Sequence, residues 1–198
     1  DWKLSHQVSD IVLMAVAAVE IERLTGSLKR AIGKFVWKND SRGLIFAYLD
    51  EGNNRLAAVN LNGDVKPLDI TIGGQSLGRP YTSGDFAVSP RGDIVYTQAT
   101  QTKPGDLALY RKKGDHTKLT SLNDDALGHK ALAQVSYLPV TSSVDERRID
   151  AWIALPPHFD KEKQYPLILE IHGGPHAAYG PHFSMEIQLM AAHGYVVV

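Results

Sequence analysis

Short hydrophobic stretches alternate with polar, glycine-containing turns along the first two thirds of the chain, and the pattern recurs. Residues 37–68 and residues 88–119 each read as strand, polar glycine turn, strand, longer loop, strand, glycine turn and short strand. Equivalent residues lie 51 positions apart, in the pairs Leu56 and Leu107, Gly63 and Gly114, and Leu68 and Leu119. The pattern predicts two similar units built from antiparallel strands.

A repeated four-stranded unit of this length is typical of a β-propeller blade. Leu24-Thr25 resembles the close of an earlier unit, and Ser89–Gly92 is expected to form a turn between two strands. A generic β-meander is the alternative. We favour the propeller because a blade needs neighbouring blades to bury its faces, which explains why the unit recurs.

The pattern changes after about Tyr137. Residues 148–155 alternate like a strand, and the apolar run Leu167–Ile171 reads as a buried strand. Residues 183–193 carry apolar side chains at helical spacing, and Gly194 follows where a helix-terminating glycine is expected. Another buried strand is predicted at Tyr195–Val198. This order of strand, loop, helix and strand indicates the opening of a parallel α/β sheet.

The apolar run that begins at Leu167 leads directly into His172-Gly173-Gly174-Pro175. Two glycines at a strand end allow a sharp turn and a close approach of the backbone to a ligand. In α/β-hydrolases a His-Gly-Gly loop after the third strand supplies a backbone N–H to the oxyanion hole. Each such donor contributes about 2.7–4 kcal/mol to transition-state stabilisation. The motif therefore indicates acyl-transfer chemistry.

Composition narrows the classes of partner. The chain has 21 basic and 22 acidic residues, so no nucleic-acid-binding or membrane-surface charge pattern is present. The longest apolar run, Ile11–Val19, is much shorter than the roughly 20 residues of a membrane helix. Cysteine is absent, which excludes disulfides and thiolate metal sites. We expect no cofactor and no metal, and we favour a cytoplasmic location over a periplasmic or secreted one.

Three segments resemble the prolyl oligopeptidase family of serine peptidases, and within it the acylaminoacyl-peptidase and dipeptidyl-peptidase branch. Ser89–Asp93 is similar to the family's Ser-Pro-Asp-Gly blade motif, with Arg91 in place of the usual acid. Residues 150–160 are similar to the entry into its hydrolase domain. Residues 172–198 are similar to its oxyanion loop, first helix and next strand, whereas residues 1–23 match nothing recognisable.

The resemblance implies β-propeller blades followed by the N-terminal part of an α/β-hydrolase domain. Residues 1–137 would be the C-terminal part of the propeller and residues 138–198 the start of the peptidase domain. The implied activity is hydrolysis of short peptides through an acyl-enzyme, by an aminoacyl-peptidase, dipeptidyl-peptidase or oligopeptidase. The resemblance places the Ser-Asp-His triad beyond Val198, so we expect residues 1–198 alone to be inactive. Whether the full-length protein forms a homo-oligomer stays open.

The resemblance also assigns site residues. The N–H of Gly174, with Gly173 beside it, corresponds to one oxyanion donor. His172, Pro175, His176 and Tyr179 are the expected substrate-side residues. Two interpretations of His172 stay open: it supports the loop, or it is a side chain at a strand end without a function. Two also stay open for Tyr179, which either borders the substrate site or has only a packing role.

Two other motifs resemble functional sites, but their sequence context favours another interpretation. Gly74–Gly78 fits the Gly-x-Ser-x-Gly pattern of a nucleophile elbow, but Pro80 and Gly84 follow where an elbow requires a helix. We predict a connection between two blades. His172 and His176 have the spacing of a helical metal pair, but the Gly-Gly-Pro sequence between them disfavours a helix.

Two other functions remain in competition. A carboxylesterase would use the same oxyanion loop, although simple esterases carry no propeller. A non-catalytic propeller that binds a partner would not need the hydrolase-like segment.

Overall fold

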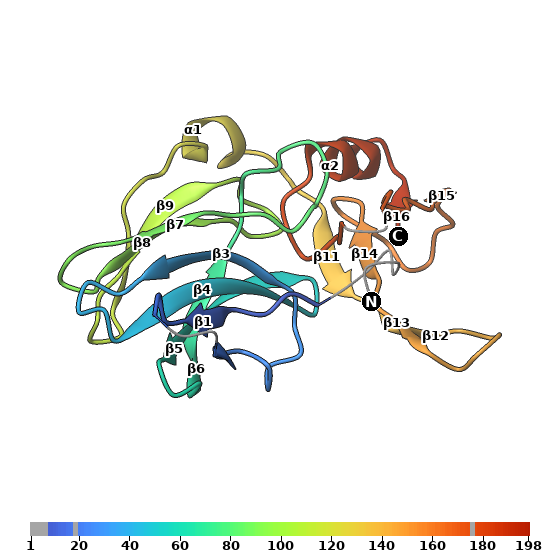
Figure 1. The fold of residues 1–198 in the computed structure, drawn as a ribbon. Helices are drawn as coiled ribbons and strands as arrows, with labels where there is room; N and C mark the ends of the chain where they lie inside the picture. Colours follow the sequence, from blue (N-terminus) through green and yellow to red (C-terminus); the bar gives the residue numbers. More distant parts are fainter. Residues whose placement is uncertain (1–7, 18–19, 175–176) are drawn as a thin grey trace.

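The computed structural model describes residues 8–17, 20–174 and 177–198. Within these residues each predicted repeat forms a four-stranded antiparallel meander (Figure 1). The first contains β3 (Ile32–Trp37), β4 (Gly43–Asp50), β5 (Asn53–Asn60) and β6 (Val65–Ile72); the second contains β7 (Phe86–Val88), β8 (Ile94–Gln98), β9 (Asp106–Tyr110) and β10 (His116–Lys118). The strand repeat is thus confirmed, with β3 starting ahead of the predicted boundary at Trp37.

The turn at residues 89–92 is confirmed as well. The N–H of Gly92 donates to the carbonyl of Ser89 over 2.9 Å, and Gly92 has a φ of +88°. Glycine adopts this left-handed conformation without the steric cost that a Cβ imposes. The turn joins β7 to β8 in a tight hairpin.

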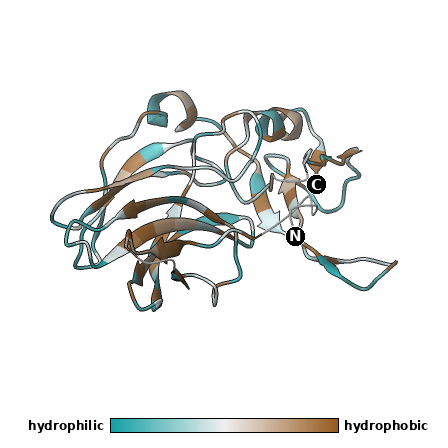
Figure 2. Ribbon diagram, viewed as in Figure 1, coloured by the Kyte–Doolittle hydropathy of each residue, from teal (hydrophilic) through white to brown (hydrophobic). Residues whose placement is uncertain are grey.

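The two meanders pack face to face through their apolar side chains. Ile45, Leu56 and Ile72 of the first sheet and Phe86 and Ile94 of the second belong to one buried cluster. The apolar strands and polar connections are visible in Figure 2. Two similar sheets stacked in this way are the arrangement of neighbouring propeller blades, although the described residues form no closed propeller.

The opposite face of the first sheet is covered by a short antiparallel pair, β1 (Val12–Met14) and β2 (Ile21–Arg23). Ile11 and Leu24 pack there against Phe46, which is fully buried. The strand β4 is therefore buried on both faces, with six consecutive buried residues.

The β1–β2 pair ends in a small hydrogen-bonded junction. The Thr25 hydroxyl accepts the N–H of Ile11 at 2.9 Å and donates to the Asp10 carboxylate at 3.2 Å. Thr25 is buried, so the hydroxyl replaces water as the partner of both groups.

The same junction recurs at the end of the second meander. The Thr120 hydroxyl accepts the N–H of Leu107 and donates to the Asp106 carboxylate, both at 2.8 Å. The shared junction agrees with the prediction that Leu24-Thr25 ends a strand pair like the one that ends the second meander; ahead of it the structure describes two strands.

The C-terminal part forms a separate sheet with the order β11-β14-β16-β15. Its strands are β11 (Gln134–Tyr137), β14 (Trp152–Leu155), β16 (Val196–Val197) and β15 (Leu167–Ile168), and β15 runs parallel to β16. The helix α2 (Met185–Ala192) connects these two parallel strands. It ends at Gly194, which has a φ of +86°, as predicted. The short helix α1 (Asp124–Leu127) lies between the meanders and this sheet in sequence.

Two predictions for this part need correction. The strand expected over residues 148–155 is divided, because β13 (Arg148–Ile149) pairs with β12 (Val140–Thr141) in a projecting hairpin, whereas β14 joins the main sheet. The run Leu167–Ile171 is not buried: the exposed fractions of Leu167, Leu169 and Ile171 are 63%, 63% and 73%. Its strand β15 lies at the edge of the sheet, and Leu169 and Ile171, which follow it, border a cavity.

The described residues include no helix that is both long and apolar enough to cross a membrane.

Candidate active site

The His-Gly-Gly segment lies in the connection between β15 and α2. Pairing with β16 continues past β15, since the N–H of Glu170 donates to the carbonyl of Val198 at 2.7 Å. Gly173 and Gly174 follow outside any strand and are exposed. A Cβ placed on Gly173 would have no neighbour within 4 Å. Pro175 and His176 lie outside the described residues, so the predictions for them stay predictions.

The structure brings His172 and Tyr179 together. Their ring centroids are 5.2 Å apart, and the Nδ1 of His172 is 2.9 Å from the carbonyl oxygen of Gly173. His172 is exposed and Tyr179 is partly buried. Both side chains border the same space. Their assignment as substrate-side residues stays a prediction.

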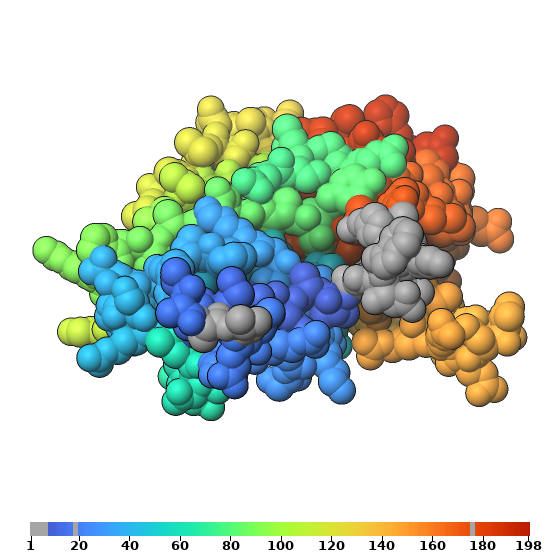
Figure 3. All heavy atoms as spheres, viewed as in Figure 1, coloured from blue at the N-terminus to red at the C-terminus, as the bar shows by residue number. Residues whose placement is uncertain are grey.

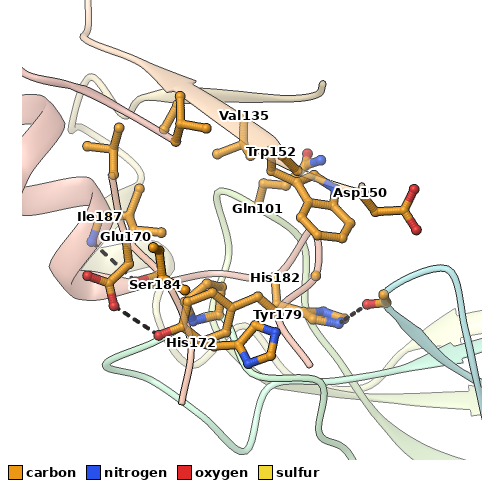
Figure 4. A pocket seen from close by; sticks show the side chains of 18 of the residues that line it. Gln101, Val135, Asp150, Trp152, Glu170, His172, Tyr179, His182, Ser184 and Ile187 are labelled. Atoms are coloured by element: carbon orange, nitrogen blue, oxygen red, sulfur yellow. Dashed lines mark hydrogen bonds between the residues drawn. The ribbon is translucent and has the colours of Figure 1, made fainter. Parts of the chain in front are cut away.

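A cavity of 390 Å³ lies between the C-terminal sheet, α2 and the meanders (Figure 4). His172 and Tyr179 line it, whereas Gly173 and Gly174 do not. Trp152 and His182 also border it, and α2 contributes Ile187. The volume lies within the range of small-molecule sites.

Tyr179 is the centre of a polar cluster at this cavity. Its hydroxyl donates to Oε1 of Glu170 at 3.0 Å and accepts a bond of 3.3 Å from Arg79. Burial raises the pKa of Tyr179 to about 12, with Arg79 opposing the shift and Glu170 adding to it. The phenol therefore stays protonated across the physiological range and acts as a hydrogen-bond donor.

Arg79 comes from the connection between β6 and β7, the segment that contains the Gly-x-Ser-x-Gly pattern. Residues 74–80 contain no helix, and Ser76 donates its hydroxyl hydrogen to the carbonyl of Arg79. Ser76 has no histidine or carboxylate partner among the described residues, which confirms that the motif is not a nucleophile elbow. The sequence showed only that this segment was a connection, because its partners lie about 100 residues further along the chain.

His182 was also missed by the sequence analysis. It is 7% exposed, and its Nε2 lies 3.1 Å from the carbonyl oxygen of Gly52, in the turn between β4 and β5. Burial lowers the pKa of His182, and the hydrogen bond to Gly52 opposes part of that shift. The neutral ring joins the first meander to the connection that follows the His-Gly-Gly segment.

The buried Gln188 anchors α2. Its side-chain oxygen accepts the N–H of Ala133 at 2.8 Å, and its amide nitrogen donates to the carbonyls of Ala133 and Gln101 at 3.3 and 3.4 Å. These contacts fix the helix against the start of β11.

No Ser-His-acid chain is present among the described residues, since no hydrogen bond in them joins a serine hydroxyl to an imidazole. They also contain no group of three or more histidine, cysteine or acidic side chains that could hold a metal ion.

Comparison with known proteins identifies relatives over most of the chain. The chain is 30% identical over 184 residues to dipeptidyl-peptidase 5 of Aspergillus fumigatus, and 28% identical over 167 residues to the uncharacterized peptidase YuxL of Bacillus subtilis. These matches cover 90% and 82% of this chain and 24% of each relative. The resemblance to the acylaminoacyl-peptidase and dipeptidyl-peptidase branch is confirmed. No family model matches the chain.

Solved structures of these peptidases share the fold. An acylaminoacyl peptidase in complex with Z-Gly-Gly-Phe-chloromethyl ketone superposes with a TM-score of 0.72 at 23% identity, over 90% of this chain and 26% of that one. The Pyrococcus horikoshii acylaminoacyl peptidase gives 0.70 at 24% identity, with the same coverage. The chain thus spans about a quarter of the length of the dipeptidyl-peptidase and acylaminoacyl-peptidase relatives.

Proposed function

We propose that this chain is part of a serine peptidase that hydrolyses short peptides through an acyl-enzyme. Gly173 and Gly174 would supply backbone N–H groups to the oxyanion hole. The observation that carries the proposal is the position of the His172–Gly174 segment. It joins a strand of the parallel pair β15–β16 to the helix α2, and hydrolases place an oxyanion donor in a connection of this kind.

The strand pairing supports a two-part organisation. We infer that β1 to β10 are propeller blades and that β11 begins the hydrolase sheet, because β11 pairs with β14 and with no blade strand. This would place the boundary before Gln134 instead of at residue 137. The stacking of the two meanders supports the propeller assignment of the first part.

The names of the relatives support a peptide substrate. Dipeptidyl-peptidase 5 of A. fumigatus is named for the removal of dipeptides, and an acylaminoacyl peptidase was solved with a tripeptide-based chloromethyl ketone. In our proposal the substrate enters the cavity beside His172 and Tyr179, and the blades restrict its size. The nucleophile, base and acid would come from residues other than those described.

The test uses the full-length protein. We expect it to release 4-nitroaniline from dipeptidyl- or N-acyl-aminoacyl-4-nitroanilides and to be labelled on serine by a fluorophosphonate. Gly174→Pro removes one N–H donor and is expected to lower kcat by about 100- to 1000-fold. Gly173→Ala, at a position with free space, keeps the N–H and serves as the matched control.

The competing functions predict other outcomes. Hydrolysis of 4-nitrophenyl butyrate without any peptide cleavage would indicate a carboxylesterase. A folded protein that hydrolyses neither substrate and takes up no fluorophosphonate would indicate a non-catalytic binding module. Full activity in Gly174→Pro would reject the oxyanion assignment.

A further inference from the structure

The His-Gly-Gly segment makes few contacts of its own. Gly173 has open space around its Cα, and the preceding Ile171 is 73% exposed. An oxyanion donor must nevertheless be held in a fixed direction, because its effect depends on preorganised geometry. The groups that flank the segment therefore have to supply its rigidity.

Two flanking side chains close the segment into a loop. Glu170 precedes it, Tyr179 follows it, and the Tyr179 hydroxyl donates to the Glu170 carboxylate at 3.0 Å. The side chain of Glu170 is only 18% exposed. The ring of Tyr179 also packs edge-on against Tyr81, with ring centroids 4.7 Å apart.

A third side chain joins both ends of this loop to the meanders. Arg79 donates from one terminal nitrogen to Glu170 at 2.7 Å and to Tyr179 at 3.3 Å, and its Nε lies 3.2 Å from the carboxylate of Glu186 on α2. The guanidinium thus contacts one side chain ahead of the His172–Gly174 segment, one behind it and one in the first turn of the next helix.

The backbone around Arg79 strengthens the connection. Residues 77–82 lie against residues 178–186, as Figure 3 shows for the green segment beside the orange and red C-terminal part. The N–H groups of Met185 and Glu186 donate to the carbonyls of Leu77 and Gly78, at 2.8 and 3.1 Å. These N–H groups are in the first turn of α2, which has no partners for them within the helix.

Several further bonds join the two segments. They are Thr82 N–H to the Ala178 carbonyl at 2.9 Å, Gly180 N–H to the Pro80 carbonyl at 3.0 Å, and the Ser184 hydroxyl to the Gly78 carbonyl at 2.7 Å. Arg79 lies in the middle of the donating and accepting residues, so its backbone position is fixed.

We propose that Arg79 is a positioning residue for the oxyanion loop. It holds Glu170 and Tyr179 together from the connection between the two meanders and thereby sets the direction of the N–H groups of Gly173 and Gly174. This role of Arg79 depends on the proposed function, because it requires that the loop takes part in catalysis. Its consequence is that a residue outside the α/β sheet controls the rate of the chemical step.

The alternative is an ordinary surface ion pair. The Arg79 side chain is 44% exposed, and exposed ion pairs contribute little to stability. The two roles differ in what a substitution changes. Loss of a surface ion pair changes neither kcat nor KM, whereas a misdirected oxyanion donor lowers kcat without weakening ground-state binding.

The experiment compares Arg79→Met, Arg79→Lys and Arg91→Met in the full-length protein. Arg91 is an exposed arginine in the β7–β8 turn without an ion pair among the described residues, so it is the matched control. We expect Arg79→Met to lower kcat at least about tenfold, with KM changed less than about twofold. Arg79→Lys should recover only part of the rate, because a lysine cannot present the guanidinium fork to several partners. The thermal midpoint of each variant should stay within about 4 °C of wild type.

An unchanged kcat in Arg79→Met would overturn the proposal, as would a kcat loss that Arg91→Met shares. A kcat loss accompanied by a large fall in the thermal midpoint would also overturn it, since general unfolding would then explain the rate.

Hydrogen exchange separates this proposal from the proposed function. If the wild-type protein hydrolyses no substrate, the proposed function fails, but the amides of Gly180, Met185 and Glu186 still report on the junction through which Arg79 holds the loop, since they donate to carbonyls of residues 77–80. Faster exchange of these amides in Arg79→Met than in Arg91→Met would support the positioning role. Equal exchange in the two variants would overturn it.

Discussion

Substitution of Gly180 by alanine tests how closely the first meander and the C-terminal part are packed. A Cβ at Gly180 would overlap the carbonyl oxygen of Gly52, lie 2.8 Å from its carbonyl carbon and lie 3.1 Å from Cδ2 of His182. Ordinary van der Waals contacts begin at 3.4 Å. The main obstacle is backbone, so a rotamer change cannot remove it. Gly52 itself has a φ of +71° and a Trp152 ring against it, which limits its freedom to move.

The expected cost follows from this overlap. Adding a methyl group to a well-packed site typically destabilises a protein by about 1–3 kcal/mol. For a protein of this size each kcal/mol lowers the thermal midpoint by about 2–4 °C, so the expected fall is about 2–12 °C. Separation of the two parts should also expose His182, which is 7% exposed in the intact structure.

The assay is thermal and urea unfolding of wild type, Gly180→Ala and the control Gly173→Ala. Both substitutions add one methyl group at a glycine whose φ is outside the left-handed region, but Gly173 has open space around it. We expect Gly173→Ala to unfold within about 0.5 kcal/mol of wild type, as surface substitutions usually do. If Gly180→Ala is as stable as Gly173→Ala, the close approach of Gly52 and Gly180 is not a property of the protein in solution.

Three further predictions concern stability and association. Thr120→Val should lower the free energy of unfolding by about 1–3 kcal/mol in urea titrations, because the N–H of Leu107 loses its partner and the Asp106 carboxylate loses one of several. Thr117→Val, on an exposed strand position, is the control, and equal effects would contradict the prediction. Burial lowers the pKa of His182 in the folded state. Its contribution to stability is therefore complete above the unfolded pKa, near 6.5, and is lost as the pH falls through the folded value. The thermal midpoint of wild type should fall between pH 7 and pH 5 more than that of His182→Asn, and parallel curves would refute this. Leu169→Lys should reduce binding of the dye 1-anilinonaphthalene-8-sulfonate to residues 1–198, because it places a charge within the exposed apolar row Leu167, Leu169 and Ile171. Unchanged dye binding would show that the dye binds elsewhere.

The sequence was sufficient to predict the repeated strands and the turns between them. The reason is physical: alternating apolar residues and left-handed glycines such as Gly92 act locally, so their pattern is readable without knowing the partners. The helix before Gly194 was predictable for the same reason. Its exact start at Met185 was missed, although Ser184 is a local N-cap signal whose side chain accepts the N–H of Ile187 at 3.2 Å. The N–H groups of Met185 and Glu186 are satisfied by carbonyls of a distant connection, which the sequence could not show.

Burial was harder to predict than strand formation. The run Leu167–Ile171 has the composition of a strand covered on both faces, but three of its apolar side chains are exposed among the described residues. An apolar sequence indicates that a strand is suited to burial on both faces. It does not show whether neighbouring elements cover those faces. The division of residues 148–155 has a similar origin, since the two halves pair with different strands.

The candidate site was predictable only in part. His172, Gly173, Gly174 and Tyr179 could be named as candidates because the motif is continuous in sequence. The structure brings the rings of His172 and Tyr179 together, and their roles stay predictions. Arg79 and His182 could not be found in the same way. Their roles depend on partners 91 and 130 positions away along the chain, and no local pattern encodes such contacts.

The connection between the two meanders, from β6 to β7, has a structural role that its sequence motif does not indicate. The segment with the misleading Gly-x-Ser-x-Gly pattern carries no nucleophile, yet it supplies two carbonyls to the start of α2 and a guanidinium to Glu170 and Tyr179. Gly74 has a φ of +90° and lies in close backbone contact with Gly105, so a side chain at either position would push the connection away from the second meander. Close backbone packing therefore explains the first glycine of the imitated motif, whereas a Cβ at Gly78 would meet only Oε1 of Glu186, at 3.8 Å. The same connection carries Arg79 to Glu170 and Tyr179, on either side of the His-Gly-Gly segment.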